Sequence, residues 1–368
     1  MSKENKKEKP APRSVDVDCI DMQSRNLNHI KLFLGIIVMV IAIYILRTLK
    51  GIFIPLTFAI FLSMLFQPLN RFLHEHKIPM WINIFVMVII ILILFTGMGT
   101  IIYTSVSSFV TEFPKYEEQI SNMVEKLFMT FEIPVEEVTY YLKNKVNWLQ
   151  LADKMSLSKV ISSTMGNFID FMVKLLLTVA FMIFIVLERT KIFERINKVI
   201  TEDEAAHSTI VTQDIERSVK TFIINKTLIS LATGLISMFF IAIFGVDFVV
   251  ISGFLIFILN YIPNFGSIVA SGFPILICFL QYGLSWQLIA ITATLIGTQM
   301  TMGNFVEPKI MGNELKLSPL VVLLSLIFWF WVWGPVGMIL AVPFTSAFNL
   351  ILKEIPSMRV ISAIISSE

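Results

Sequence analysis

Long apolar blocks alternate with short polar segments along most of this chain. Four blocks, at residues 36–45, 82–95, 175–187 and 228–244, contain no charged side chain. A helix of about 20 mostly apolar residues can cross the roughly 30 Å hydrocarbon core of a bilayer, and a helix satisfies its own backbone hydrogen bonds inside lipid. The pattern predicts helical membrane spans at 31–46, 52–69, 81–103, 168–187, 221–245 and 286–305.

Residues 104–166 follow a different pattern. Apolar residues recur there at steps of three and four, and charged residues occupy the other positions. This spacing is typical of amphipathic helices. Pro134 ends the first such helix, and a second one follows. The pair is too polar to span a membrane, so we expect a small helical insertion outside it, whose apolar faces need a partner.

Two apolar stretches in the second half, 248–281 and 320–353, are too long for one comfortable span and too short for two. Proline removes a backbone donor and glycine permits a turn, so either residue can break a helix. Each stretch is therefore predicted to be a broken or re-entrant helical hairpin. The breaks read Asn260-Tyr261-Ile262-Pro263-Asn264-Phe265-Gly266-Ser267 and Trp331-Val332-Trp333-Gly334-Pro335-Val336-Gly337.

Composition agrees with a membrane protein. Apolar residues make up 56% of the chain and charged residues 15%, whereas a soluble domain has about 45–50% and about 25%. The net charge of +2, without a dense basic patch, argues against nucleic-acid binding. Cys19 and Cys278 are badly placed to pair, so we expect free thiols, no metal site and no cofactor.

Basic residues beside the spans predict the orientation. They are concentrated in the N-terminal tail, in the loop at 70–77 and at 188–198, which fall on one side if the first five spans alternate. That side is predicted to be the cytoplasm, so the N-terminus is cytoplasmic and residues 104–166 lie outside. Arg47 and Lys50 are exceptions to this rule.

The predicted fold is all-α, a polytopic helical membrane protein with about eight membrane segments that include the two broken hairpins. The expected organisation is a disordered cytoplasmic tail (1–30), spans one to three (31–103), the extracytoplasmic amphipathic insertion (104–166), span four (167–187), a cytoplasmic helical linker (188–220), a C-terminal core with both hairpins (221–353) and a cytoplasmic tail (354–368).

Several motifs in the C-terminal half resemble the signature of the autoinducer-2 exporter (AI-2E) family of bacterial secondary transporters, and segment 260–267 is similar to that family's other marked motif. The layout also agrees along nearly the whole chain, although the N-terminal half has no equally specific motif. The motifs are Gly303-Asn304-Phe305-Val306-Glu307-Pro308-Lys309-Ile310-Met311-Gly312, Leu317-Ser318-Pro319-Leu320-Val321-Val322-Leu323-Leu324-Ser325, Trp333-Gly334-Pro335-Val336-Gly337 and Ala341-Val342-Pro343.

The resemblance implies a multi-pass transporter of the bacterial cytoplasmic (inner) membrane that moves a small polar solute by alternating access. Family members are linked to export of the furanone-type signal autoinducer-2, and some to sodium/proton exchange. A sodium (or other cation)/proton antiporter is therefore the alternative, since family membership defines transport better than cargo. The resemblance also implies a homo-oligomer, with a pentamer as the suggested state. Expected partners are the lipid bilayer, the solute, and Na+ or H+.

Glu307 is the strongest candidate for ion coupling, together with Gln299 and Lys309. A carboxylate at the bilayer centre costs roughly 2.5–3.5 kcal/mol, so one that is kept there usually carries ions or protons. If the span at 286–305 continues as a helix, Gln299, Gly303 and Glu307 recur at four-residue steps on one face. The alternative is that Glu307 and Lys309 begin a cytoplasmic loop.

The two breaks contain the candidate solute-binding residues. Polar side chains at the first break can contact a solute, or they can satisfy the backbone groups that a proline exposes. The residues of the second break lack polar side chains, so they act through backbone groups or simply interrupt the helix. The candidates are Asn260, Pro263, Asn264, Gly266, Ser267, Gly334, Pro335 and Gly337.

Other functions fit less well. An enzyme would need a nucleophile with its base, or metal ligands, within the spans. The sequence has no HExxH motif, no GxSxG motif and no histidine inside a predicted span, so no catalytic residue is proposed. A membrane scaffold without transport is a minor alternative. Asp247 ends a predicted span and is expected only to meet water, whereas Asp170 and Lys174 have the spacing of an ion pair.

Overall fold

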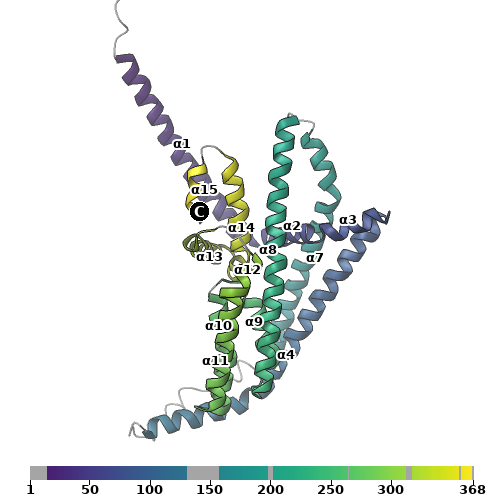
Figure 1. Cartoon of the computed structure of the whole chain (residues 1–368), viewed down its shortest axis with the longest axis vertical. Coiled ribbons are helices and arrows are strands. Elements are labelled where there is room, and N and C mark those ends of the chain that lie inside the picture. The colour runs from purple at the N-terminus through teal and green to yellow at the C-terminus, as the bar shows by residue number, and fades with distance from the viewer. Residues whose placement is uncertain are drawn as a thin grey trace, which may run out of the picture. The chain divides into compact units, whose positions relative to one another are not determined.

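Helices make up almost all of the described structure, which confirms the predicted all-α fold (Figure 1). The computed structural model describes residues 15–130, 157–197, 202–263, 265–311, 317–355 and 358–366. It divides into two compact units, Met1–Phe53 and Ile54–Glu368. Five of its helices are long and apolar enough to cross a membrane, or six if the pair Phe33–Thr48 and Lys50–Leu65 counts as one broken span.

The first unit consists mainly of α1 (Val15–Thr48). The prediction of a disordered tail over residues 1–30 is wrong for residues 15–30, which are helical. No proline or glycine interrupts the chain between Val15 and Gly35, so the polar segment continues the apolar helix. Residues 1–14 lie outside the described residues. Leu49 separates α1 from α2 (Lys50–Leu65).

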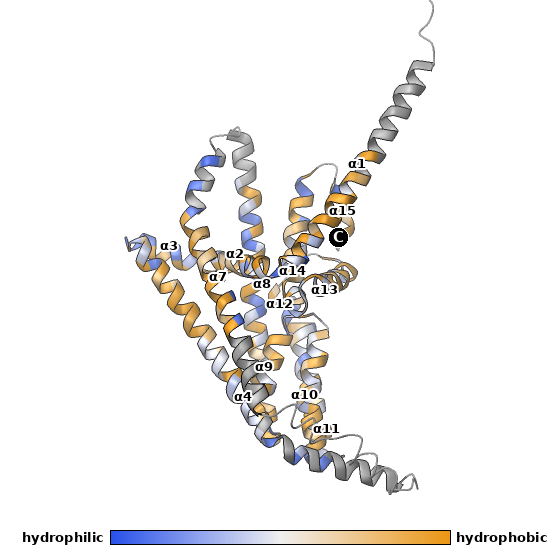
Figure 2. Ribbon diagram, turned by 180° about the vertical axis from the view of Figure 1, so that it is seen from behind, coloured by the Kyte–Doolittle hydropathy of each residue, from blue (hydrophilic) through white to orange (hydrophobic). Residues whose placement is uncertain are grey.

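A group of four helices, three of them largely apolar, lies at the N-terminal end of the second unit. It comprises the later part of α2, α3 (Gln67–Glu75), α4 (Met80–Thr130) and α7 (Leu157–Asn197). The candidate spans Met80–Phe109 and Ile169–Glu188 coincide with two predicted spans and are mostly hydrophobic in Figure 2. The buried residues that join α2, α4 and α7 are Ala59, Phe66, Met87, Ile91, Leu175, Met182 and Val186.

Two predicted boundaries differ from the structure. The span at 81–103 does not end before the insertion, because α4 continues to Thr130; the rest of the insertion, 131–156, lies outside the described residues. The linker predicted at 188–220 is divided between the ends of α7 and α8 (Glu202–Ile243). The expected ion pair between Asp170 and Lys174 is present, with 2.5 Å between Oδ2 and Nζ.

The polar extension of α4 contacts the turn that follows α8. The Tyr116 hydroxyl donates a 2.6 Å hydrogen bond to Asp247 Oδ2, and Lys115 Nζ lies 3.2 Å from the same oxygen. The expectation that Asp247 meets only water is therefore wrong, since a residue 131 positions earlier in the chain binds it. Burial, and then the hydrogen bond to Asp247, raise the pKa of Tyr116.

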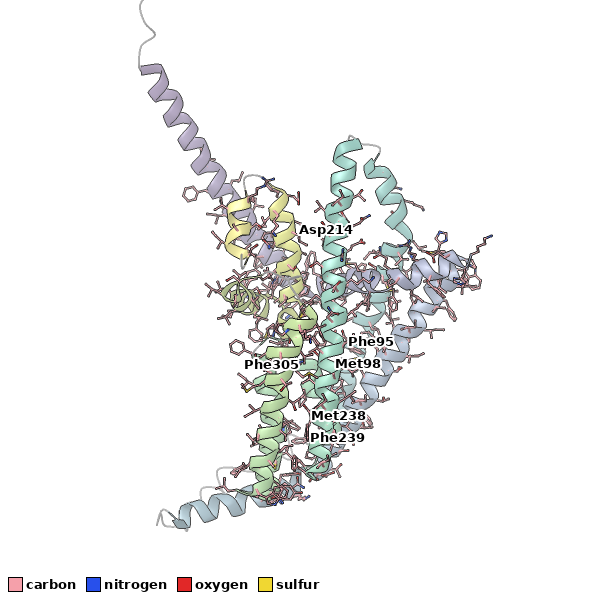
Figure 3. The ribbon with its side chains drawn as sticks, in the orientation of Figure 1. Phe95, Met98, Asp214, Met238, Phe239 and Phe305 are labelled. Carbon is pink, nitrogen blue, oxygen red and sulfur yellow. The ribbon has the colours of Figure 1, made fainter. Side chains whose placement is uncertain are left out.

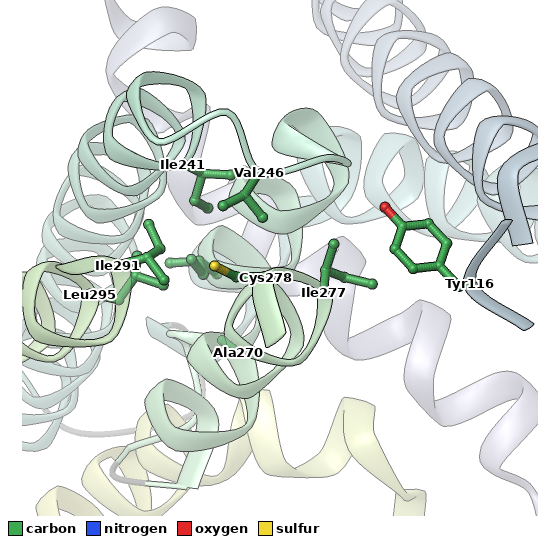
Figure 4. Close-up of a cluster of buried hydrophobic side chains, with 9 residues drawn as sticks. Tyr116, Ile241, Val246, Ala270, Ile277, Cys278, Ile291 and Leu295 are labelled. Atoms are coloured by element: carbon green, nitrogen blue, oxygen red, sulfur yellow. The ribbon is translucent and has the colours of Figure 1, made fainter. Parts of the chain in front are cut away.

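Tyr116 also provides a contact between the apolar face of the insertion and the rest of the second unit. It is 1% exposed and belongs to a cluster of buried, mostly apolar residues in the second unit (Figure 4). The other members of this cluster are Ile241, Val246, Ile256, Ala270, Ile277, Cys278, Ile291 and Leu295.

We expect Tyr116→Phe to lower the free energy of unfolding by about 1.5–3 kcal/mol, because a hydrogen bond to a charged group is lost while the ring remains. Thermal unfolding in detergent measures this change. Since the raised pKa of Tyr116 means that ionisation disfavours the fold, stability should fall above about pH 10 in the parent protein, and less steeply in the variant. The control is Tyr103→Phe on the same helix, whose parent side chain is 63% exposed. An equal loss of stability in Tyr116→Phe and Tyr103→Phe would contradict a stabilising hydrogen bond between Tyr116 and Asp247.

Both predicted helix breaks are present. The first broken element consists of α9 (Val249–Leu259) and α10 (Phe265–Tyr282), and the second of α13 (Pro319–Trp333) and α14 (Pro335–Glu354). Helix α9 has 11 residues and is therefore about 16 Å long, which is roughly half the thickness of the hydrocarbon core of a bilayer. Figure 1 shows α13 nearly end-on beside the upright α14, so the chain turns sharply between them.

The segment between the two broken elements is helical but irregular. It begins with α11 (Trp286–Thr301), continues as the π-helix η1 (Met302–Val306) and ends with α12 (Glu307–Met311). Phe305, in the π-helical part, is labelled in Figure 3 and is 72% exposed. A last helix, α15 (Arg359–Ile365), packs on α14 through a 2.7 Å hydrogen bond from Ser362 to Asn349.

Candidate functional site

An ion pair between a buried lysine and a partly buried glutamate connects α8 with α12. Lys226 Nζ lies 2.5 Å from Glu307 Oε1, and the two side chains are 2% and 24% exposed. Lys226 lies within the candidate span Thr209–Ile243. Charged groups inside membrane spans are costly and are therefore usually functional. This pair is the centre of the candidate site.

Buried apolar residues flank Lys226 on the same face of α8. Phe222 and Ile229, about one turn before and after Lys226 on α8, are 5% and 2% exposed. They pack in one cluster with Met311, at the end of α12, and with Val342 of α14. In such surroundings, an ammonium or carboxylate without a partner would be strongly destabilised. The two charges therefore depend on each other.

A π-helical turn immediately precedes Glu307. Helix continues through this region, so the alternative in which Glu307 begins a loop is wrong. The wider π-turn lies between Gln299 and Glu307, however, and it changes the angular position of Glu307 from that of an unbroken α-helix. Single π-turns within α-helices occur often at functional sites.

The first break contacts α8 beside the ion pair. The Tyr261 and Thr227 hydroxyls lie 2.6 Å apart, and Asn260 Nδ2 donates a 3.3 Å hydrogen bond to Ser230 Oγ. Asn260 is 8% exposed and Ser230 is fully buried. The polar residues that follow α9 are therefore held against the segment of α8 that contains Lys226.

Both breaks require glycine, because a backbone carbonyl group lies too close to leave room for a side chain. A Cβ atom on Gly266 would lie 1.7 Å from the Leu259 carbonyl oxygen, and one on Gly337 would lie 2.0 Å from the Trp329 carbonyl oxygen. Gly334 has φ +68° and ψ −149°, a conformation that is essentially restricted to glycine. In both breaks, a glycine thus packs directly against a backbone carbonyl group of the preceding helix.

The two broken elements meet. Ile262, in the first break, packs with Leu326 of α13 and Ala341 of α14 in one buried cluster. Trp329 packs against Phe344 across the second element in a tilted arrangement, with 4.5 Å between ring centroids. Both breaks and the ion pair therefore belong to one continuous region around α8.

The predicted site residues differ in their burial and in the contacts that they make. Asn260 and Glu307 make the contacts above, and Gly266 and Gly337 are buried at the breaks. Asn264 lies outside the described residues. Gln299 is partly buried, and its Nε2 has no hydrogen-bond partner among the described residues. The other predicted residues are partly buried (Pro263, Ser267 and Gly334) or exposed (Lys309 and Pro335).

Sequence reasoning missed Lys226, although a signal for it existed. The residue lies inside the span predicted at 221–245, and a lysine at such a position is itself a functional signal. Its pairing with Glu307, 81 residues later, depends on the tertiary structure. Within the described residues, no group of three or more His, Cys, Asp or Glu side chains could hold a metal ion.

Comparison with known proteins agrees with this architecture. The chain is 28% identical over 345 residues to AI-2 transport protein TqsA of Escherichia coli K12, covering 92% of this chain and 96% of that protein. It is also 28% identical over 324 residues to "Putative transport protein YhhT" of the same organism, covering 86% and 88%. The model of the AI-2E family transporter matches residues 33–357. Since this match extends over most of the chain, the protein belongs to the AI-2E transporter family.

Proposed function

We propose that this protein is a secondary transporter that moves a small polar solute across the bacterial cytoplasmic membrane by alternating access. The observation that carries the proposal is the buried Lys226–Glu307 pair beside the break that follows α9. Helix breaks near buried charges provide backbone dipoles that can hold a polar solute or ion. The proposal includes a cytoplasmic N-terminus and a homo-oligomeric assembly in the bilayer.

Glu307 can couple transport to an ion gradient if a proton or Na+ replaces Lys226 as the partner of its carboxylate. While Lys226 neutralises Glu307, neither charge is available to a transported species. A proton or Na+ that takes the place of Lys226 at Glu307 would release the ammonium and change the balance of charge in the core. The state with a released lysine and the state with an ion pair would then favour different arrangements of the neighbouring broken elements.

The test is transport into proteoliposomes, with and without gradients of pH and Na+. The solute panel includes autoinducer-2, which the name of the TqsA relative suggests. We expect Glu307→Gln to reduce gradient-driven uptake at least tenfold, because the amide cannot exchange a proton or attract a cation. The control is Lys353→Gln, at an exposed position near the end of α14, which should retain uptake. Gradient-driven uptake that is unchanged in Glu307→Gln would contradict the coupling role.

A cation/proton antiporter is the second candidate function, and the single carboxylate in the buried pair favours it. In this case the same proteoliposomes would acidify or alkalinise in response to a Na+ gradient without any organic solute. Glu307→Gln should abolish that signal. Solute uptake without such exchange would favour the first candidate.

A further inference from the structure

The C-terminal helix folds back onto the second broken element, where α15 lies beside the end of α14 (Figure 1). The side-chain amide of Asn349 joins the two segments. Its Oδ1 accepts a 2.7 Å hydrogen bond from Ser362 Oγ, and its Nδ2 donates a 3.2 Å hydrogen bond to Ser366 Oγ. Asn349 and Ser362 are 4% and 2% exposed. Since buried polar groups are costly to leave unpaired, these bonds hold residues 359–366, which we call the C-terminal strap, against α14.

The C-terminal strap also pairs with the segment that leads into α13. Leu317 and Ser366 form an antiparallel β-bridge, and the Ser318 amide donates a 2.9 Å hydrogen bond to the Ile365 carbonyl oxygen. The start of α13 and the end of α14 are therefore joined through the strap, in addition to their covalent connection at Gly334. The strap thus restrains the two helices of the second broken element relative to each other.

Residues at this β-bridge pack beside the ion pair. Leu317 is 9% exposed and belongs to the buried apolar cluster that flanks Lys226 on α8. The same cluster contains Met311, the last residue of the helix that begins with Glu307. Ile365 of the C-terminal strap packs against this cluster. Side-chain packing therefore connects the strap with both helices that carry the ion pair.

We infer that the C-terminal strap is a positioning element for the ion pair, which holds α12 against α8 and thereby keeps Glu307 beside Lys226. Glu307 lies between the π-helical turn and the end of α12 at Met311. Packing of Met311 against Leu317 and the strap residue Ile365 therefore contributes to the position of the carboxylate. The inference rests on the proposed function for its biological purpose, because the position of Glu307 matters if this carboxylate couples transport to an ion gradient.

Two variants of the full protein release the strap. Chain termination after Met358 removes it, and Asn349→Leu removes both of its side-chain hydrogen bonds to α14 at similar volume.

Chemical labelling of Glu307 reports the ion pair without measuring transport. Dicyclohexylcarbodiimide is an apolar reagent that modifies protonated carboxyl groups, and mass spectrometry identifies the modified residue. In the parent protein the pairing with Lys226 favours the ionised carboxylate, so labelling near neutral pH should be slow. We expect labelling to be at least tenfold faster when the strap is released, because Glu307 then loses its partner, and gradient-driven uptake to fall at least tenfold.

Tyr116→Phe is the control for a general loss of stability. It is also expected to destabilise the protein, but Tyr116 belongs to a different buried cluster from the one beside the ion pair. Glu307 labelling should therefore stay slow in this variant. A strap that merely stabilises the fold would give Asn349→Leu and Tyr116→Phe the same labelling rate at equal unfolding temperature, and this result would overturn the inference.

The β-bridge offers a reversible covalent link between the strap and the start of α13. The hydrogen bond from Ser318 to Ile365 lies beside Leu317 and Ser366, which makes these two residues a non-hydrogen-bonded pair with Cα atoms about 4.5 Å apart. A disulfide spans Cα distances of about 4.4–6.8 Å. Cysteines at these two positions should therefore form a disulfide.

This disulfide separates positioning from folding within one protein. Leu317→Cys/Ser366→Cys is combined with Asn349→Leu, with serine and alanine in place of the two native cysteines. Under oxidising conditions the strap is held in place, so Glu307 labelling should be slow and uptake should be close to that of the parent. Reduction should accelerate labelling at least tenfold and lower uptake again.

The outcomes separate the two proposals. Glu307 labelling that stays slow after release of the strap, or that does not respond to the disulfide, would overturn the positioning role. If the positioning role fails in this way while the parent protein carries solute, the proposed function stands. Fast labelling after release of the strap, in a protein whose parent moves neither solute nor ion, would support the positioning role and contradict the proposed function.

Discussion

Replacing Lys226 by methionine should destabilise the protein by about 3 kcal/mol, the lower end of the usual range for a broken buried pair, because the partly buried Glu307 carboxylate would lose its counter-charge. The lysine is 2% exposed, its ammonium lies 2.5 Å from the carboxylate, and Phe222, Ile229 and Met311 pack nearby. Methionine fills a similar volume, so the loss reports mainly the uncompensated charge. Thermal unfolding followed by tryptophan fluorescence in detergent measures it.

The double variant Lys226→Met/Glu307→Gln distinguishes charge from packing. Removing both charges should restore most of the lost stability, since replacing a buried ion pair by neutral groups is often close to neutral. The double variant should nevertheless remain inactive in gradient-driven uptake, because the carboxylate is gone. If the losses of the two single variants simply added, the pair would not be coupled, and the site as described would be wrong.

Gly266→Ala should have the second large effect, destabilising the protein by about 3 kcal/mol. The new methyl group would lie 1.7 Å from the Leu259 oxygen and 2.7 Å from the Leu259 carbonyl carbon, both backbone atoms that cannot move aside as a flexible side chain can. The first break would have to open, which would disturb the contacts of Asn260 and Tyr261 with α8. Uptake should therefore fall together with the unfolding temperature.

A matched substitution on the same helix is available as a control. A Cβ at Gly272, also on α10, would meet nothing within 4 Å. Gly272→Ala should therefore stabilise the protein by about 0.5–1 kcal/mol through the helix preference of alanine. Gly337→Ala should repeat the effect of Gly266→Ala at the second break. Equal tolerance of alanine at Gly266 and Gly272 would show that the close approach at Leu259 does not exist.

Fold class and helix breaks were predictable from the pattern of residues along the chain. Apolar blocks without charges have few stable arrangements in a bilayer other than helices, and proline and glycine interrupt a helix through covalent geometry that is independent of the rest of the chain. This is why segments 260–267 and 331–337 were predicted as breaks and are breaks in the structure. Glu307 stood out for a similar reason, as a carboxylate within a marked motif at the end of a span.

The contacts that form the site, in contrast, could not be predicted from the pattern of residues. Lys226 and Glu307 are 81 residues apart, and Tyr116 and Asp247 are 131 apart. Such contacts depend on how helices pack, and the one-dimensional pattern of apolar and polar residues does not contain this information. The π-helical turn before Glu307 is equally invisible in the sequence, since it changes backbone hydrogen bonding without a distinctive residue. Local chemistry thus defined where helices break, and packing defined the site.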